Sequence, residues 1–354
     1  MLKLVGFAKQ YLYGARLFGG VSAEFASGET VAVFGGEGSG KSSFLKALGG
    51  AEAHEGEVLL DGEPLRLGAD GVVMVFEDGA VFPFRTVYDN LAYPLRLRGV
   101  GKVEIASRVI AAAERMSIGA CLNLRARNLN AEDRRRMSLA RLLVRDVRLA
   151  LVDEPTKGLM RESAESVMRD FCEAVRELRS KGATVLYSTS HRDEMFAACD
   201  RVVVLAHGEV KQIASPAEIL RAPESVWAAQ AVDEDYNVRK CTLTDKNGRL
   251  SLVYDDGTEQ DAECLRHRAA ESYIGKEVLA GWYPDCADGR SPTGACVLAV
   301  GSRRGFTLIS EDGIKELSPV RRGEVRLLPS VDCVTLYDST NECSIMIPDG
   351  EERA

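Results

Sequence analysis

The stretch VAVFGGEGSGKSS, residues 31–43, decides the fold of this chain. It begins within the apolar segment Thr30–Phe34, which is typical of a buried β-strand, and runs into a helical pattern over Lys41–Leu48. The glycine-rich turn between them fits the spacing G-x-x-x-x-G-K-[ST], which cradles phosphates when it joins a strand to a helix. The sequence therefore predicts a phosphate-binding loop in an α/β fold.

The residue types in this loop suit the binding of ATP with Mg²⁺. Glycines let successive backbone N–H groups turn toward phosphate oxygens, and the following helix presents its positive N-terminal end. Lys41 supplies a charge to the β- and γ-phosphates, and the Ser42 hydroxyl is a ligand for Mg²⁺. The predicted nucleotide-binding residues of the loop are Gly35, Gly36, Gly38, Ser39, Gly40, Lys41, Ser42 and Ser43.

Apolar segments alternate with helical patterns as far as about residue 230. The predicted strands are Thr30–Phe34, Val72–Phe76, Leu149–Val152, Thr184–Tyr187 and Val202–Leu205. Several are unbroken apolar runs, as expected for a sheet that is covered on both faces. The predicted helices are Lys41–Leu48, Val103–Met116, Asp133–Val144 and Glu162–Ser180. This order predicts an α/β fold with a largely parallel sheet.

The pattern changes near residue 235. Beyond it, short strand-like segments are separated by the turn pairs Asn247-Gly248, Asp256-Gly257, Asp312-Gly313 and Asp349-Gly350. We therefore expect two domains, residues 1–234 and residues 235–354, of which the second is rich in β-structure.

Two further segments predict catalytic side chains. LALVDEPT, residues 149–156, carries Asp153 and Glu154 to the carboxyl end of a strand, where ligands bind in open α/β sheets. Asp153 suits Mg²⁺, and Glu154 suits the activation of a water for attack on the γ-phosphate. VLYSTSHRDEM, residues 185–195, places His191 after another strand, within reach of the same phosphate.

Composition narrows the class of protein. The net charge is −8 and the pI about 5.3, which argues against nucleic acid as the main partner. The longest apolar runs are only strand-sized, and the N-terminus MLKLVGFAKQ has no features of a secretory signal. Nine cysteines occur singly without a CxxC pair, which favours reduced cytosolic thiols over disulfides or zinc.

Together the motifs resemble the ATP-binding cassette (ABC) ATPases over residues 1–230. The resemblance is to importer ATPases of the sugar-uptake type, whose C-terminal extension carries OB-like (TOBE-type) β-domains. The similar stretches are Val81–Ile105, Asp200–Pro223 and Ile274–Asp285. The resemblance implies a cassette with a helical subdomain at about residues 78–145, followed by a regulatory β-domain.

The resemblance also implies roles for single residues and a setting for the chain. Tyr13 matches the aromatic residue that stacks on adenine, Glu154 the general base, and His191 the sensor of the γ-phosphate. The implied ligands of Mg²⁺ are Ser42, Asp153 and Glu77. A groove near residues 77–100 is implied to receive a membrane-embedded permease, with the chain peripheral on the cytoplasmic face of the cell membrane.

The chain departs from the family at several positions. Glu77 stands where the family has glutamine, and the loop KGLM at residues 157–160 replaces small residues that end in aspartate. The signature Leu-Ser-Gly-Gly-Gln is replaced by LNAED, so that a serine hydroxyl is lost and Glu132 replaces a glycine. A carboxylate about 4 Å from a phosphate charge is repelled by about 4 kcal/mol at an effective dielectric of about 20. The degenerate signature residues are Asn130, Ala131, Glu132 and Asp133.

These departures affect the two ATP sites of a cassette dimer differently. In the family, two cassettes sandwich two ATPs head to tail, and each ATP takes its signature from the opposite chain. The elements that serve this chain's own ATP are mostly present, whereas those it would lend to a partner are degraded. This favours a heterodimer with an intact cassette over a homodimer. The alternatives are a homodimer with little hydrolysis that acts as a nucleotide-gated structural subunit, and a soluble nucleotide-dependent regulator or P-loop kinase.

Overall fold

The computed structural model divides into two compact units, Met1–Pro216 and Ala217–Ala354. It describes residues 1–10, 16–66, 71–77, 79, 81–233, 236–266, 271–282, 297–302, 305–310, 313–314, 334–340 and 342–346. The boundary between the two units, after Pro216, lies earlier than the one expected from the change of sequence pattern near residue 235. A β-bridge between Ser225 and Cys343 ties the segment after residue 216 to the second unit.

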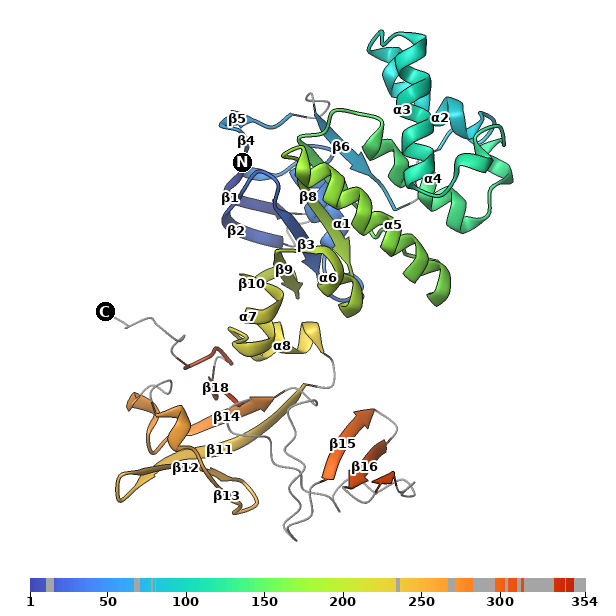
Figure 1. Ribbon diagram of the computed structural model, residues 1–354. Coiled ribbons are helices and arrows are strands. Elements are labelled where there is room, and N and C mark those ends of the chain that lie inside the picture. Colours follow the sequence, from blue (N-terminus) through green and yellow to red (C-terminus); the bar gives the residue numbers. More distant parts are fainter. Residues whose placement is uncertain are drawn as a thin grey trace. The chain divides into compact units, whose positions relative to one another are not determined.

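A six-stranded sheet in the order β10-β9-β3-β8-β7-β6 forms the centre of the first unit (Figure 1). Its strands are β3 (Thr30–Phe34), β6 (Val72–Val75), β7 (Leu149–Val152), β8 (Thr184–Thr189), β9 (Arg201–Ala206) and β10 (Glu209–Ala214). All neighbouring pairs are parallel except β9 and β10. Every residue of β3, β7 and β8 is buried, as expected for a sheet that is covered on both faces. The parallel order brings the carboxyl ends of these three strands to one edge of the sheet.

A second, antiparallel sheet has the order β2-β1-β4-β5. Its strands are β1 (Leu2–Gln10), β2 (Arg16–Phe25), β4 (Glu55–Leu60) and β5 (Glu63–Pro64). The sequence pattern did not predict this sheet, because register shifts along β1 interrupt the strict alternation of a half-buried strand. Its apolar side chains share one core with α1 (Lys41–Leu48) and the six-stranded sheet, where Phe7, Phe18 and Phe44 contact one another.

Three helices gather at the end of the first unit that lies beyond β6 (Figure 1). They are α2 (Val87–Leu97), α3 (Lys102–Arg115) and α4 (Ala131–Leu143). The long helix α5 (Arg161–Ser180) packs against α4, β8 and the short helix α6 (Arg192–Ala198). α4 begins before the predicted start at Asp133, because the Asn130 side chain accepts a hydrogen bond from the Asp133 N–H and caps the helix. None of the described helices has the length and apolar character needed to cross a membrane.

The second unit is rich in β-structure, as predicted. A five-stranded antiparallel sheet has the order β13-β12-β11-β14-β18, and β15, β16 and β17 form a separate sheet. Its elements are α7 (Pro216–Arg221), α8 (Val226–Val232), β11 (Asn237–Lys246), β12 (Arg249–Tyr254), β13 (Glu259–Asp261), β14 (Glu277–Trp282), β15 (Val297–Ser302), β16 (Gly305–Ser310), β17 (Gly313–Ile314) and β18 (Thr335–Asp338). Asn247 and Gly248 take φ angles of 57° and 78° between β11 and β12, as a two-residue hairpin turn requires. The predicted turn residue 312 and the pair 349–350 lie outside the described residues, and the OB-like character stays a prediction.

Candidate functional site

The loop between β3 and α1 has a backbone shape suited to an anion. Gly38 and Gly40 take positive φ angles of 75° and 101°. Gly40 directly precedes α1, and no side chain caps the first N–H groups of that helix. A Cβ on Gly35 would lie 2.2 Å from the carbonyl oxygen of Leu205, so only glycine fits there. The loop therefore presents N–H groups at a helix N-terminus, where a phosphate is favourably bound.

Ser39 allows a test of whether the loop suits a phosphate. Its side chain is buried, and its Oγ has no hydrogen-bond partner among the described residues. A buried hydroxyl without a partner costs about 1–3 kcal/mol, and a phosphate oxygen in the loop is a suitable acceptor. Gly36 and Ser43 belong to the same loop and to the first turn of α1. The loop thus fits the predicted ligand, whereas the predicted adenine-stacking residue Tyr13 lies outside the described residues.

Lys41 is buried at the mouth of the loop, where its ammonium group has three partners. Nζ donates to the carbonyl oxygens of Gly35 and Gly36 at 2.9 and 3.0 Å. It also forms an ion pair with Glu154 at 3.2 Å, in which both side chains are 5% exposed. The two charges neutralise each other in a region that is largely shielded from water. A phosphate that enters the loop therefore competes with Glu154 for this lysine.

Asp153 is held by hydroxyl groups from two elements. Its Oδ1 accepts hydrogen bonds from Ser42 on α1 at 2.9 Å and from Ser188 on β8 at 2.7 Å. A hydroxyl and a carboxylate are ligands that Mg²⁺ takes together with phosphate oxygens and water, so Ser42 and Asp153 fit the predicted metal. Ser188 was not predicted. It follows the predicted strand Thr184–Tyr187 directly, and no local signal points to it, because its partners lie about 35 residues away in the sequence.

Glu154 takes an unusual backbone conformation directly after Asp153. Its φ is 48°, in the left-handed region, which costs a residue with a Cβ about 1–2 kcal/mol. Its N–H donates to Ser188 Oγ at 2.9 Å, and its side chain pairs with Lys41. These contacts hold the strained turn and direct the carboxylate toward the phosphate loop. A carboxylate in this place can accept a proton from a water beside a phosphate.

Glu77, the third predicted Mg²⁺ ligand, has a different partner. It follows β6, and its Oε1 lies 3.2 Å from Nζ of Lys157, with both side chains 44% exposed. The hydrogen bond with Glu77 is the main cause that raises the pKa of Lys157. Within the described chain, no hydrogen bond joins Glu77 to Ser42 or Asp153. The structure therefore places Glu77 in an ion pair and does not bring it into the cluster around Asp153.

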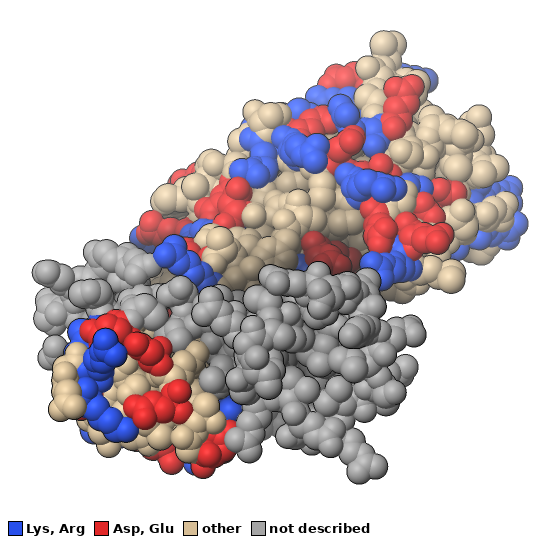
Figure 2. Space-filling view, turned by 60° about the horizontal axis from the view of Figure 1, so that its bottom comes forward, with Lys and Arg blue, Asp and Glu red and all other residues tan. Residues whose placement is uncertain are grey.

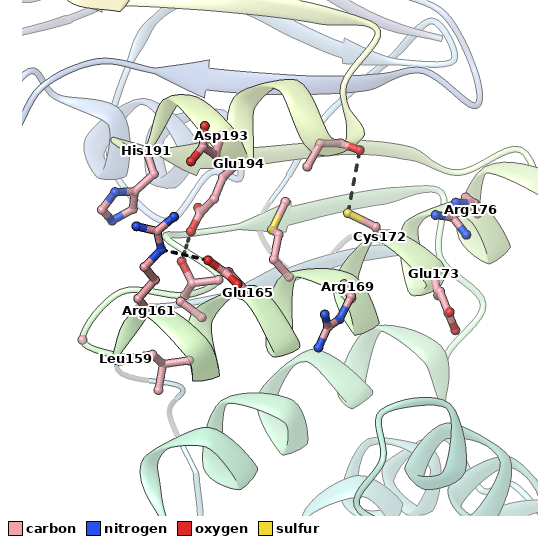
Figure 3. Close-up of a pocket in the computed structure, with 15 residues that line it drawn as sticks. Leu159, Arg161, Glu165, Arg169, Cys172, Glu173, Arg176, His191, Asp193 and Glu194 are labelled. Atoms are coloured by element: carbon pink, nitrogen blue, oxygen red, sulfur yellow. Dashed lines mark hydrogen bonds and ion pairs between the residues drawn. The ribbon is translucent and has the colours of Figure 1, made fainter. Parts of the chain in front are cut away.

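His191 lies at the rim of a cavity of about 860 Å³ along α5 and α6 (Figure 3). Its backbone N–H donates to Thr189 Oγ1 at 3.0 Å, and its side chain is exposed. Among the described residues its ring has no hydrogen bond to Lys41 or Glu154. Figure 3 shows His191 and Arg161 at the same end of this cavity. The structure thus places His191 on the cavity along α5 and α6, whose lining does not include Lys41 or Glu154.

Glu194 is a buried acid that the sequence did not single out. It accepts hydrogen bonds from Thr156 Oγ1 and, at 2.7 Å, from Thr189 Oγ1. Thr156 lies in the loop after Glu154, and Thr189 ends β8 just before His191. Glu194 therefore ties together the two loops that carry the predicted catalytic residues.

Replacing Glu194 by alanine is expected to lower the free energy of unfolding by about 2–3 kcal/mol, because two threonine hydroxyls are left buried without an acceptor. Thermal unfolding of the full chain measures this loss. The exposed neighbour Asp193 provides the matched control, and its replacement by alanine is expected to change stability by less than about 0.5 kcal/mol. If the two variants were equally stable, the hydrogen bonds of Glu194 to the two loops would not contribute to stability as proposed.

The residues predicted to form a degenerate signature interact with their own helix. Asn130 Oδ1 accepts a hydrogen bond from the Asp133 N–H at 2.6 Å. Glu132 turns back along α4 to form an ion pair with Arg136 at 2.7 Å, and Arg136 also pairs with Asp170 on α5. The Glu132 carboxylate is therefore neutralised within this chain. The repulsion estimated from the sequence assumed an unpaired carboxylate, and it is smaller in this geometry.

Exposed apolar side chains lie on α2 and on the segment that leads into it. They comprise Phe82, Phe84, Tyr93 and Leu97, and we call this surface the docking patch. Phe84 and Leu97 are each 70% exposed, and the rings of Phe82 and Tyr93 lie 4.8 Å apart. The buried side chain of Asn90 bonds both the N–H and the carbonyl oxygen of Phe82, which fixes the segment on α2. An exposed apolar surface of this kind is typical of a site that binds another protein.

Charged side chains of both signs are mixed on one face of the first unit (Figure 2). Figure 2 shows Lys and Arg interspersed with Asp and Glu on the visible face, without a broad region of one sign. Local ion pairs therefore set the electrostatic potential on this face more than a long-range field does.

Comparisons with known proteins agree with this geometry. The sequence profile of a family described as ABC transporter matches residues 18–157. The sn-glycerol-3-phosphate import ATP-binding protein UgpC of Vibrio vulnificus is 34% identical over 258 residues, which cover 72% of this chain and 68% of the relative. UgpC of Cupriavidus necator is 30% identical over 292 residues, with 80% and 79% covered. The uncharacterized ABC transporter ATP-binding protein YurJ of Bacillus subtilis is 31% identical over 266 residues, with 73% and 71% covered.

Solved structures show the same fold. The structure of cbiO1 from Clostridium perfringens, described as part of the ABC transporter complex cbiONQ, matches with a TM-score of 0.55 and 26% identity. The match covers 62% of this chain and 89% of that chain. The ATP-binding cassette MJ0796, described as dimeric in a post-hydrolysis state with ADP and Pi, matches with a TM-score of 0.54 and 24% identity. It covers 61% of this chain and 98% of that chain, and it supports the fold alone.

Proposed function

Because this chain belongs to the ATP-binding cassette family of transporter ATPases, we propose that it hydrolyses ATP at its own phosphate loop with the help of an intact second cassette. The family places the chain as the ATP-binding subunit of an importer. The observation that carries the finer proposal is the buried cluster of Lys41, Ser42, Asp153 and Glu154. In this cluster Lys41 can bind phosphates, and Ser42 and Asp153 can bind Mg²⁺. Glu154 can accept a proton from a water.

The Lys41–Glu154 ion pair suggests how this chain's residues act on ATP. Mg²⁺, when bound through Ser42 and Asp153, neutralises charge on the β- and γ-phosphates. Lys41 exchanges its contact with Glu154 for one with the phosphates, because a phosphate oxygen is a strong acceptor for an ammonium group. The Glu154 carboxylate is then free to accept a proton from the attacking water. In this proposal His191 contacts the γ-phosphate from the rim, and Tyr13 stacks on the adenine.

The second cassette is proposed from what the signature region of this chain does. Asn130 caps α4, and Glu132 forms an ion pair with Arg136 on the same helix. The two residues therefore offer a poor binding site to the nucleotide of an opposing cassette. An intact partner would supply the signature that this chain's ATP needs. The alternative is a homodimer with little hydrolysis that acts as a nucleotide-gated subunit. ATP turnover of the chain with and without an intact cassette separates the two, since the alternative predicts no stimulation.

The docking patch is proposed to receive a permease subunit on the inner face of the cell membrane. Its aromatic and apolar side chains are exposed, and Asn90 fixes the backbone at Phe82, which suits a protein-binding surface. The relatives from Vibrio vulnificus and Cupriavidus necator are named for import of sn-glycerol-3-phosphate. By analogy we propose a sugar or a related polar solute as the cargo, and an OB-like regulatory role for the second unit.

Replacing Phe84 and Leu97 together by alanine is expected to weaken binding of the chain to its permease by at least about tenfold, since buried anchors are each worth about 2 kcal/mol or more. Co-purification and ATPase stimulation by the permease in vesicles measure the loss. Val103 on α3 is 87% exposed and serves as the matched apolar control. If Val103→Ala weakens the complex as much as the double variant, the patch is not the docking surface.

A further inference from the structure

Two residues that depart from the family pattern contact each other. Glu77 stands in place of a glutamine and Lys157 in place of a small residue, and their side chains form an ion pair at 3.2 Å. They follow β6 and β7, which are neighbouring parallel strands. The pair therefore bridges the two loops at the edge of the sheet that carries Asp153 and Glu154.

The surroundings of Lys157 are acidic. Apart from Glu77, whose hydrogen bond is the main cause, the charges of Glu154 and Glu37 also raise the pKa of Lys157. Glu37 belongs to the phosphate loop, and Glu154 is the partner of Lys41. Carboxylates thus outnumber lysines where a triphosphate is proposed to bind. An uncompensated negative charge here opposes the binding of an anionic ligand.

The backbone holds Lys157 in this place. Its N–H donates to the carbonyl oxygen of Glu154 at 3.3 Å, in the turn that follows β7. Its own carbonyl oxygen accepts a hydrogen bond from the Arg135 guanidinium on α4 at 3.3 Å. Gly158 follows with a φ of 78°, which ends the turn. The position of the lysine is therefore set by the loop, although its side chain is half-exposed.

We propose that Lys157 is a positioning residue whose charge makes the carboxylate of Glu77 compatible with binding of Mg-ATP; this inference rests on the proposed function. Lys157 cancels the charge of Glu77 beside the phosphates and holds its carboxylate at the loop edge. Loss of the lysine alone leaves Glu77 uncompensated. A glutamine at position 77 removes the need for the lysine, so the two substitutions are coupled.

The test compares the full-length wild type with Lys157→Ala, Glu77→Gln and the double variant. Isothermal titration calorimetry measures the Kd of a non-hydrolysable ATP analogue with Mg²⁺. We expect Lys157→Ala to weaken binding about tenfold, which corresponds to about 1.4 kcal/mol. Glu77→Gln alone is expected to change the Kd less than about threefold, and the double variant to return to within about threefold of the wild type. Added salt should shrink the effect of Lys157→Ala, because both side chains reach solvent.

Two controls separate positioning from a general loss of structure. Lys157→Arg keeps the charge and is expected to retain wild-type affinity. Lys181 forms a comparable exposed pair with Glu177, and Lys181→Ala should leave the Kd unchanged. If the double variant binds as weakly as Lys157→Ala, or if all variants bind alike, the inference is overturned. A wild-type chain that fails to bind the analogue would instead contradict the proposed function.

Discussion

Replacing Glu154 by glutamine is expected to lower ATP turnover by about a hundredfold or more, because the amide cannot accept the proton of the attacking water. Affinity for ATP is expected to rise, since Lys41 no longer has to leave an anionic partner to reach the phosphates. Phosphate release by the full chain with its permease and its partner cassette, together with binding of a fluorescent ATP analogue, measures both effects. Opposite changes in turnover and affinity are the specific mark of the Lys41–Glu154 pair.

A matched control for this variant lies on α5. Glu173 is 52% exposed and lies 3.8 Å from Arg115, and Glu173→Gln is expected to leave both turnover and affinity unchanged. A Glu154→Gln protein that turns over ATP at the wild-type rate would exclude Glu154 as the base.

Restoring the signature is expected to have the second large effect. The triple variant Asn130→Ser, Ala131→Gly and Glu132→Gly should raise the ATP turnover of the chain by at least about tenfold. Each hydrogen-bond donor aimed at the charge that develops on the phosphate typically contributes more than about tenfold in rate. Stability is expected to fall by about 1–2 kcal/mol, because two glycines enter the first turn of α4 and the ion pair to Arg136 is lost. Steady-state phosphate release and thermal unfolding measure the two quantities.

The single substitution Asn130→Ser separates the contributions. Serine caps a helix about as well as asparagine, so stability should be nearly unchanged while the hydroxyl is regained. The account of the signature would be wrong if the triple variant hydrolysed ATP no faster than the wild type.

Much of the fold follows from local sequence patterns. β3, β7 and α1 have the bounds that were predicted from the sequence. Each is a strong pattern: two solid apolar runs and one helix that opens on a glycine turn. The sheet β2-β1-β4-β5 was missed, because pairing between β1 and β4 joins segments far apart in the chain and includes register shifts.

The residues of the candidate site were predictable from the sequence where their positions depend only on the ends of strands. Lys41, Ser42, Asp153 and Glu154 come together because β3 and β7 both lie beside β8 and end at one edge. Side-chain partners across loops were not predictable. That Glu77 binds Mg²⁺ stays a prediction, and its ion pair with Lys157 depends on how two loops fold over neighbouring strands.

The buried hydrogen bonds were not predicted for the same reason. The hydrogen bonds from Ser188 to Asp153 and from Thr156 to Glu194 join residues far apart in the sequence, so no local spacing points to them. Asn130 and Glu132 were predicted in a loop before the helix, but Asn130 is the N-cap of α4 and Glu132 lies in its first turn. Their contacts within α4 became visible only with the side chains in place.

The measurement that tests the central claim most directly is a mixing experiment. The wild-type chain is combined with a variant that carries the restored signature together with Glu154→Gln. In a mixed dimer, only the wild-type phosphate loop has both a base and an intact opposing signature. The account predicts that each protein alone hydrolyses ATP slowly and that the mixture is at least about tenfold faster than their sum. A mixture no faster than the sum of its two components would contradict it.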